Sequence, residues 1–153
     1  MAGHSQIAPI LMAEDDEDDR MMAEKAFREN RIANPLVTVA NGADLLDYLR
    51  QKGKFADSAA SPRPCLILLD LNMPKMDGRE ALKHIKADEK LMRIPVVIIT
   101  TSKAEEDILV SYNVGANSYI TKPITFEGLV KTIKTIKDYW LEIVELPNGP
   151  AHV

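Results

Sequence analysis

The sequence predicts an α/β fold, in which a doubly wound sheet of five parallel strands carries helices on both faces. Short apolar runs alternate along the chain with segments whose apolar residues recur at helical spacing. The run Cys65–Leu69 is apolar at five consecutive positions, as expected of a strand buried on both faces of a parallel sheet. The expected strands lie near residues 8–13, 36–40, 65–69, 95–100 and 118–121.

Length and composition indicate one globular domain. The chain has 153 residues, of which 46% are hydrophobic and 27% charged. No apolar stretch is long enough for a membrane span, and a net charge of −4 without a basic stripe argues against a nucleic-acid partner. The single cysteine fits a reducing compartment, so we expect a cytoplasmic protein.

Acidic residues directly follow the first predicted strand, in the run Glu14–Asp19. Such a run is usually a solvated patch, but here it occupies a strand-to-helix turn. Asp18 and Asp19 suit the first turn of the next helix, where the helix dipole favours negative charge. Glu14 and Asp15 come earlier, at the strand end itself, and need another explanation.

Asp70 ends the buried third strand, which is where open α/β sheets place their ligands. Taken alone, Asp70 could equally cap the following turn. Together with Glu14 and Asp15 it forms a set of three carboxylates that repel one another unless a cation is present. Hard oxygen ligands of this kind suit Mg²⁺. The sequence therefore predicts a magnesium site at the carboxyl edge of the sheet.

The fourth and fifth strands also end in polar residues. Ser102 and Glu105 have the spacing of a capping box for the next helix. Thr100 still belongs to the strand, so we expect its hydroxyl in the same crevice as Asp70. Lys122, which a following proline holds in place, can offer a positive charge to a phosphoryl group.

As a set, these strand-end residues resemble the receiver domain of two-component response regulators. The resemblance covers roughly residues 7–137 and rests on the following positions: Glu14, Asp15, the segment Asp70–Pro74, Asp77, Gly78, Thr100, Lys122 and Pro123. It implies a flavodoxin-like strand order and a partner histidine kinase. One departure is Glu14, where many members carry aspartate.

The resemblance also implies a role for each residue of the pocket. Asp70 would accept the phosphoryl group, while Glu14, Asp15, Asp70 and the Asn72 carbonyl would organise Mg²⁺. In addition, Thr100 and Lys122 would contact the phosphoryl oxygens, and Tyr119 would be the switch aromatic. Apart from transfer to itself and its own dephosphorylation, such a protein is not expected to be an enzyme.

Two other classes of function could use an aspartate at this strand end. A phosphohydrolase with an aspartate nucleophile needs a second carboxylate two residues later, and that position is Asn72, which cannot act as an acid or base. A receiver-like binding module that is never phosphorylated needs a broken pocket, whereas this one is complete. A small phosphodonor distinguishes the three classes: a receiver gains one phosphate, a hydrolase turns over many donor molecules, and an inert module does neither.

The C-terminal segment, residues 138–153, extends beyond the receiver and leaves no room for an output domain. Apolar residues at helical spacing up to Trp140 seat the last helix on the sheet. Tyr139, Ile143 and Val144 then add a surplus of apolar groups, which either folds back or covers another protomer. We expect a homodimer whose interface includes these three residues and Trp140.

The connection over residues 50–64 is longer than a receiver needs, and its composition predicts a surface loop. It is either a tolerated insertion or a contact for a partner. The segments Ser61–Pro64 and Tyr139–Glu142 resemble stand-alone receivers that serve phytochrome histidine kinases. This resemblance implies a phytochrome kinase as the partner.

Overall fold

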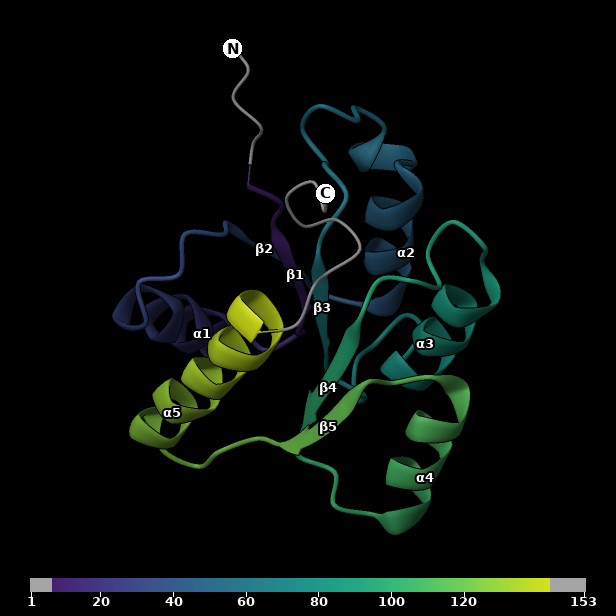
Figure 1. Cartoon of the computed structure of the whole chain (residues 1–153). Coiled ribbons are helices and arrows are strands. Elements are labelled where there is room, and N and C mark those ends of the chain that lie inside the picture. Colours follow the sequence, from purple (N-terminus) through teal and green to yellow (C-terminus); the bar gives the residue numbers. More distant parts are fainter. Residues whose placement is uncertain (1–6, 144–153) are drawn as a thin grey trace.

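One parallel sheet organises the computed structural model, which describes residues 7–143. Its strands lie in the order β2-β1-β3-β4-β5 (Figure 1). Their bounds are β1 (Ile10–Ala13), β2 (Leu36–Val39), β3 (Leu66–Leu69), β4 (Val96–Thr100) and β5 (Ser118–Thr121). Each strand falls within the range expected from its apolar run, so the predicted doubly wound fold is confirmed.

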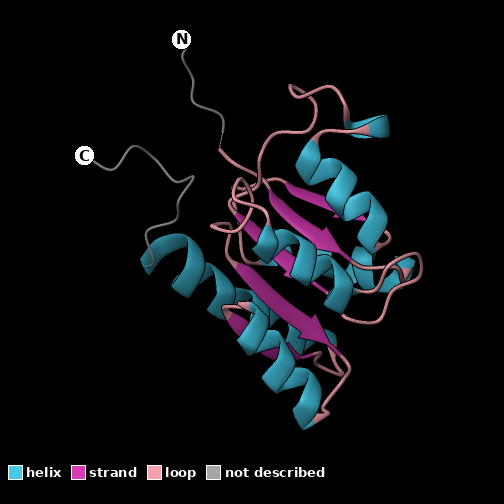
Figure 2. Ribbon diagram, turned by 90° about the vertical axis from the view of Figure 1, so that its right-hand side faces the viewer, coloured by secondary structure: helices cyan, strands magenta, loops and turns pink. Residues whose placement is uncertain are grey.

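Helices cover both faces of the sheet. Figures 1 and 2 show α1 (Glu17–Glu29) and α5 (Phe126–Ile136) on one face, and α2 (Gly42–Arg50), α3 (Gly78–Ala87) and α4 (Glu105–Val114) on the other. Successive strand residues alternate between these layers: Leu66 and Leu68 pack towards α1 and α5, and Ile67 and Leu69 pack towards α2 and α3. This two-sided burial explains why the central strands are apolar at every position.

Most helices begin with a side-chain cap, and α4 is the exception. Asp16, Asn41, Asp77 and Thr125 each accept a hydrogen bond from a backbone amide of the helix that follows. The capping box predicted for Ser102 and Glu105 is wrong. The N-cap position of α4 is Ala104, which has no side-chain cap. Ser102 lies two residues earlier, where its hydroxyl donates to Asp107 Oδ2 at 2.6 Å.

The long connection between α2 and β3 is tied to its own domain at both ends. After α2 the chain forms one 3₁₀ turn, η1 (Gly53–Phe55). The Phe55 ring packs edge-on against the Tyr48 ring, with 5.3 Å between the two centroids. The Tyr48 hydroxyl donates to the Pro62 carbonyl at 2.8 Å, and Gln51 Nε2 donates to the Ser61 carbonyl at 3.1 Å. Residues 56–60 between these anchors are exposed.

After α5 the chain continues as a π-helical segment, η2 (Lys137–Ile143). Trp140 is only 9% exposed and joins Ile133 and Ile136 in the core, because it continues the helical spacing of the buried face. Tyr139 points elsewhere and is 51% exposed. Trp140 therefore belongs to the domain's own core and is removed from the expected dimer interface. The side chain of Ile143, and Val144 as a whole, lie outside the described residues.

Within residues 7–143, no helix has both the length and the apolar character needed to cross a membrane.

Candidate functional site

The three predicted carboxylates meet at the carboxyl edge of the sheet. Ala13 of β1 pairs with Leu69 of β3, so the residues that follow, Glu14 and Asp70, emerge side by side. Glu14, Asp15 and Asp70 each offer one oxygen, and these oxygens lie within 4.8 Å of one another. Glu14 and Asp70 are buried, whereas Asp15 is exposed. The cluster is therefore open to solvent on the side of Asp15.

Glu14 is the most deeply buried acid of the cluster. Its Oε2 accepts a hydrogen bond from the Asp16 amide at 3.1 Å. Its Oε1 forms an ion pair with Lys122 Nζ at 2.5 Å. Burial raises the pKa of Glu14 to about 7, against the opposing effect of Lys122 and the Asp16 amide. The end of β1 thus holds a buried carboxylate against a cationic partner.

Lys122 brings positive charge into the cluster from the end of β5. Its Nζ lies 3.3 Å from Asp70 Oδ2 and 3.0 Å from Asp19 Oδ2. Burial alone would lower the pKa of this ammonium, but Glu14, Asp19 and Asp70 together raise it above its usual value. The Lys122 amide also donates to the Thr100 carbonyl at 2.7 Å, which fixes the backbone from which the side chain reaches the acids.

Asp19 is a residue of this network that the sequence did not assign to the site. Its position suggested only a favourable interaction with the dipole of α1, and it does lie in the first turn of that helix. The structure adds the contact with Lys122. Helical spacing gave no signal for this contact, because Asp15 precedes α1 and only Asp19 lies within it.

Thr100 and Asn72 line the crevice beside Asp70. Thr100 is fully buried, and its Oγ1 accepts from Asn72 Nδ2 and from the Ser102 amide, both at 3.5 Å. The backbone amide of Asn72 donates to Asp70 Oδ1 at 3.2 Å. Thr100 thus lies in the same crevice as Asp70, as the strand pattern predicted, although the structure records no direct hydrogen bond between them.

The turn after Asp70 depends on Gly78, the first residue of α3. A Cβ atom there would lie 2.2 Å from the Asp70 carbonyl oxygen, so no larger residue fits without displacing the backbone. The Gly78 amide also donates to the Leu71 carbonyl at 2.9 Å. Between them, Lys75 and Met76 adopt left-handed backbone conformations. This close approach holds the loop that carries Asn72 against the end of β3.

Tyr119, the expected switch aromatic, lies on β5 beside the loop that follows β4. Its hydroxyl donates to the Ser102 carbonyl at 3.1 Å. Its ring is partly buried and packs against the core layer under α2 and α3. Its amide donates to the Tyr112 hydroxyl at 3.1 Å, which satisfies a donor at the edge of the sheet. The side chain therefore connects the edge strand with the Thr100–Ser102 segment.

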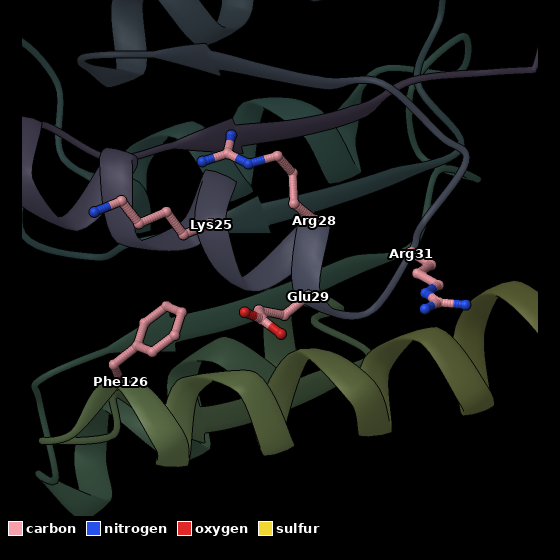
Figure 3. A pocket seen from close by; sticks show the side chains of 5 residues that line it. All are labelled: Lys25, Arg28, Glu29, Arg31 and Phe126. Atoms are coloured by element: carbon pink, nitrogen blue, oxygen red, sulfur yellow. The ribbon is translucent and has the colours of Figure 1, made fainter.

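A second concave region lies between α1 and α5, apart from the acidic cluster (Figure 3). This groove has a volume of about 470 Å³ and is lined by Lys25, Arg28, Glu29, Arg31 and Phe126. None of these residues belongs to the predicted site. The acids, Thr100 and Lys122 instead converge at the ends of the strands.

A doubly wound sheet with three acids, a threonine and a lysine at its carboxyl edge defines a response regulator of the two-component type. The family described as the response regulator receiver domain matches residues 10–134, and the chain belongs to this family. The class predicted from the strand-end residues is thereby confirmed.

Individual relatives refine this assignment. Response regulator Rcp1 from Synechocystis is 41% identical over 138 residues, which make up 90% of this chain and 92% of Rcp1. The solved structure of the phosphorylated cyanobacterial phytochrome response regulator RcpA has a TM-score of 0.87 at 41% identity, over 94% of this chain and 100% of that one. The Mn²⁺-bound form of Rcp1 has a TM-score of 0.83 at 41% identity, over 92% and 99% of the two chains. These similarities confirm the predicted likeness to phytochrome-associated regulators.

Proposed function

We propose that a partner histidine kinase transfers a phosphoryl group to Asp70 in a Mg²⁺-dependent reaction that switches the interaction surface of this regulator. The observation that carries the proposal is the placement of Asp70, whose buried carboxylate lies at the strand end within 3.3 Å of Lys122 Nζ. In the transfer, the bond between phosphorus and the kinase histidine breaks as a bond from phosphorus to an Asp70 oxygen forms. Catalysis of this step needs positioning and charge stabilisation rather than a separate base.

The acidic cluster fits a magnesium ion. Glu14, Asp15 and Asp70 would hold it through their carboxylates, and Asn72 would add its carbonyl. The clustered carboxylate oxygens and the manganese-bound form of the relative Rcp1 support this assignment. When bound, the ion would neutralise charge on the oxygens of the transferring group.

The protein's own residues then respond to the phosphoryl group. Lys122 supplies a positive charge next to the Asp70 oxygen that it already contacts. The Thr100 hydroxyl turns towards a phosphoryl oxygen, and Tyr119 follows it inward. Water attack on the acyl phosphate returns Asp70 to its free carboxylate and ends the signal. Tyr112 of α4 is 48% exposed, and its hydroxyl accepts from the Tyr119 amide, so a shift of Tyr119 changes the surface at α4.

Acetyl phosphate with Mg²⁺, followed by intact-mass analysis, tests the proposed function. We expect the chain to gain one phosphoryl group, and to lose it again after the donor is removed. Turnover of many donor molecules without a phosphorylated chain would instead indicate a phosphohydrolase. A chain that neither gains phosphate nor consumes donor would be an inert binding module.

The kinase that we propose is a phytochrome. The likeness to RcpA supports this partner, because the two chains align over 94% of the present sequence at 41% identity. Phosphotransfer from a purified phytochrome kinase should then be much faster than from a histidine kinase of another sensory class, at equal concentrations. Equal rates from both kinases would contradict the assignment.

Magnesium is expected to stabilise the unphosphorylated protein, because it relieves repulsion among Glu14, Asp15 and Asp70. An ion present at 100 times its dissociation constant contributes about 2.7 kcal/mol to the free energy of unfolding. Asp15→Asn should raise the melting temperature in EDTA, since it removes one of the repelling charges, and should weaken the response to Mg²⁺. If EDTA and millimolar Mg²⁺ give the parent protein the same melting curve, the acidic cluster is not a metal site.

A homodimer that uses the C-terminal face is a further expected outcome. Tyr139 is half-exposed above the buried Trp140, and burying a large apolar side chain contributes about 1.5–3 kcal/mol before the cost of association. Light scattering coupled to size exclusion should give twice the 17.0 kDa of one chain at micromolar concentration.

Tyr139→Glu should shift this dimer towards the monomer. The matched control is Met92→Glu, because Met92 is 46% exposed and lies outside α5 and η2. A parent mass near 17.0 kDa would contradict the dimer. Equal dissociation by both variants would place its interface elsewhere.

A further inference from the structure

An ion pair joins the first turns of α3 and α4 beside the phosphoacceptor crevice. Arg79 Nε donates to Asp107 Oδ1 at 2.8 Å, and Arg79 Nη2 donates to Asp107 Oδ2 at 2.7 Å. The arrangement is bidentate, which fixes both the distance and the orientation of the two groups. The Arg79 guanidinium and the Ser102 hydroxyl lower the pKa of Asp107 to about 2, so this acid is ionised at neutral pH.

The ion pair reaches the switch residues through Ser102. The Ser102 hydroxyl donates to Asp107 Oδ2 at 2.6 Å, and its carbonyl accepts from the Tyr119 hydroxyl at 3.1 Å. Its amide points to Thr100 Oγ1 at 3.5 Å. One residue therefore contacts the ion pair, the buried threonine and the switch tyrosine, each through a different group.

We infer that Arg79 and Asp107 are positioning residues for the phosphorylation switch, because their ion pair holds Ser102 where its carbonyl receives the Tyr119 hydroxyl. The inference rests on the proposed function, in which Thr100 and Tyr119 respond to the phosphoryl group on Asp70. With the ion pair in place, the loop after β4 moves as one unit with α3 and α4. Without it, Thr100 and Tyr119 respond independently of each other.

The local structure at the start of α4 supports a positioning role for this contact. The helix begins at Glu105, and its N-cap residue Ala104 makes no side-chain hydrogen bond to it. Ser102 lies two residues before Ala104, where its hydroxyl donates to Asp107 Oδ2 and accepts from the Ala104 amide at 3.4 Å. These two bonds tie the loop after β4 to the same carboxylate that Arg79 holds.

The test combines substitutions of the ion pair with Tyr119→Phe, in the full chain labelled with 3-fluorotyrosine. Tyr119→Phe identifies the Tyr119 signal by its loss. Arg79→Gln and Asp107→Asn should change this fluorine signal before any donor is added, and should leave Mg²⁺ affinity at the parent value. With acetyl phosphate and Mg²⁺, each should alter the half-life of the phosphoryl group by about threefold to tenfold. Arg79→Lys, which keeps the charge but not the fork, should be intermediate.

The decisive comparison is a double-mutant cycle. If Arg79 acts through the Tyr119 hydroxyl, Arg79→Gln has no further effect on the half-life in the Tyr119→Phe background. The control is Lys54→Gln, which removes the ion pair with Asp44 at 3.1 Å, away from Ser102, and should change neither readout. Effects of Arg79 and Tyr119 that multiply independently would overturn the inference, as would an unchanged Tyr119 signal in Arg79→Gln.

The Tyr119 fluorine signal of the unphosphorylated protein tests this inference separately from the proposed function. If acetyl phosphate does not label the parent chain, the proposed function fails. The contact between Ser102 and Tyr119 is still tested by the response of the Tyr119 signal to Arg79→Gln. Asp107→Asn serves as a second variant should Arg79→Gln fail to fold, and thermal melts of each variant report its folding.

Discussion

Asp70→Asn is expected to abolish phosphorylation while leaving the protein folded. The amide has the shape of the carboxylate, and its oxygen can still accept the hydrogen bond that the Asn72 amide donates at 3.2 Å. The nucleophilic oxygen, one negative charge and the ion pair with Lys122 are lost, but Lys122 keeps Glu14 and Asp19 as partners. Because Asp70 is 4% exposed and lies beside Glu14, removal of that charge also reduces repulsion in the cluster. The melting temperature in EDTA should therefore not fall substantially.

Intact-mass analysis after treatment with acetyl phosphate and Mg²⁺ measures this effect. The parent chain should gain one phosphoryl group and Asp70→Asn none. Asp138→Asn is the matched control, since it removes an exposed acid that pairs with Lys134 at 2.8 Å on the last helix. That variant should be phosphorylated like the parent. A phosphate retained by Asp70→Asn, and located by peptide analysis, would show that another residue is the acceptor.

Lys122→Met is expected to destabilise the metal-free protein more than any other single substitution in the pocket. Lys122 Nζ contacts Glu14, Asp19 and Asp70, and the side chains of Glu14 and Asp70 are 1% and 5% exposed. Removing one member of a buried ion pair costs about 3–5 kcal/mol, because the remaining charge is uncompensated. Mg²⁺ should restore part of the loss. Lys134→Met, which breaks an exposed pair, should cost about 0–1 kcal/mol.

The cost of Lys122→Met should depend on pH. In the parent protein, burial raises the pKa of Glu14 to about 7 from an ordinary 4.5, so between these values the folded state binds more protons than the unfolded state. The Glu14 contribution to stability therefore falls as pH rises through this window. Without Lys122 the pKa of Glu14 rises further. Urea unfolding in EDTA should thus show a larger loss at pH 8 than at pH 5, and a larger loss at pH 5 would contradict this account.

Much of the fold was predictable because burial leaves a simple signature in the sequence. Strands covered on both faces must be apolar throughout, and Leu66–Leu69 and Val96–Thr100 lie where their apolar runs predicted them. The pocket was predictable for a related reason. Parallel strands end at the same edge, so polar residues that directly follow them, such as Glu14 and Asp70, are brought together by topology alone.

What the sequence did not predict are contacts between side chains on different helices and loops. The partnership of Arg79 with Asp107 depends on how α3 and α4 pack, and neither residue carries a local signal of the other. The predicted capping box failed because α4 begins two residues later than a cap at Ser102 requires, with Ala104 at the N-cap. Trp140 has a helical spacing that fits both a core and an interface, and only the packed structure places it in the core.

The anchored connection between α2 and β3 offers a place to attach a reporter. It enters β3 at the end opposite Asp70, and its exposed residues 56–60 lie between the fixed Phe55 and Ser61. Because the chain on both sides is held by Tyr48 and Gln51, a fluorescent protein or affinity tag inserted there would leave the flanking backbone in register. Such a fusion would leave the carboxyl edge of the sheet and the C-terminal segment accessible to partners. Kinase and regulator could then be followed together in living cells.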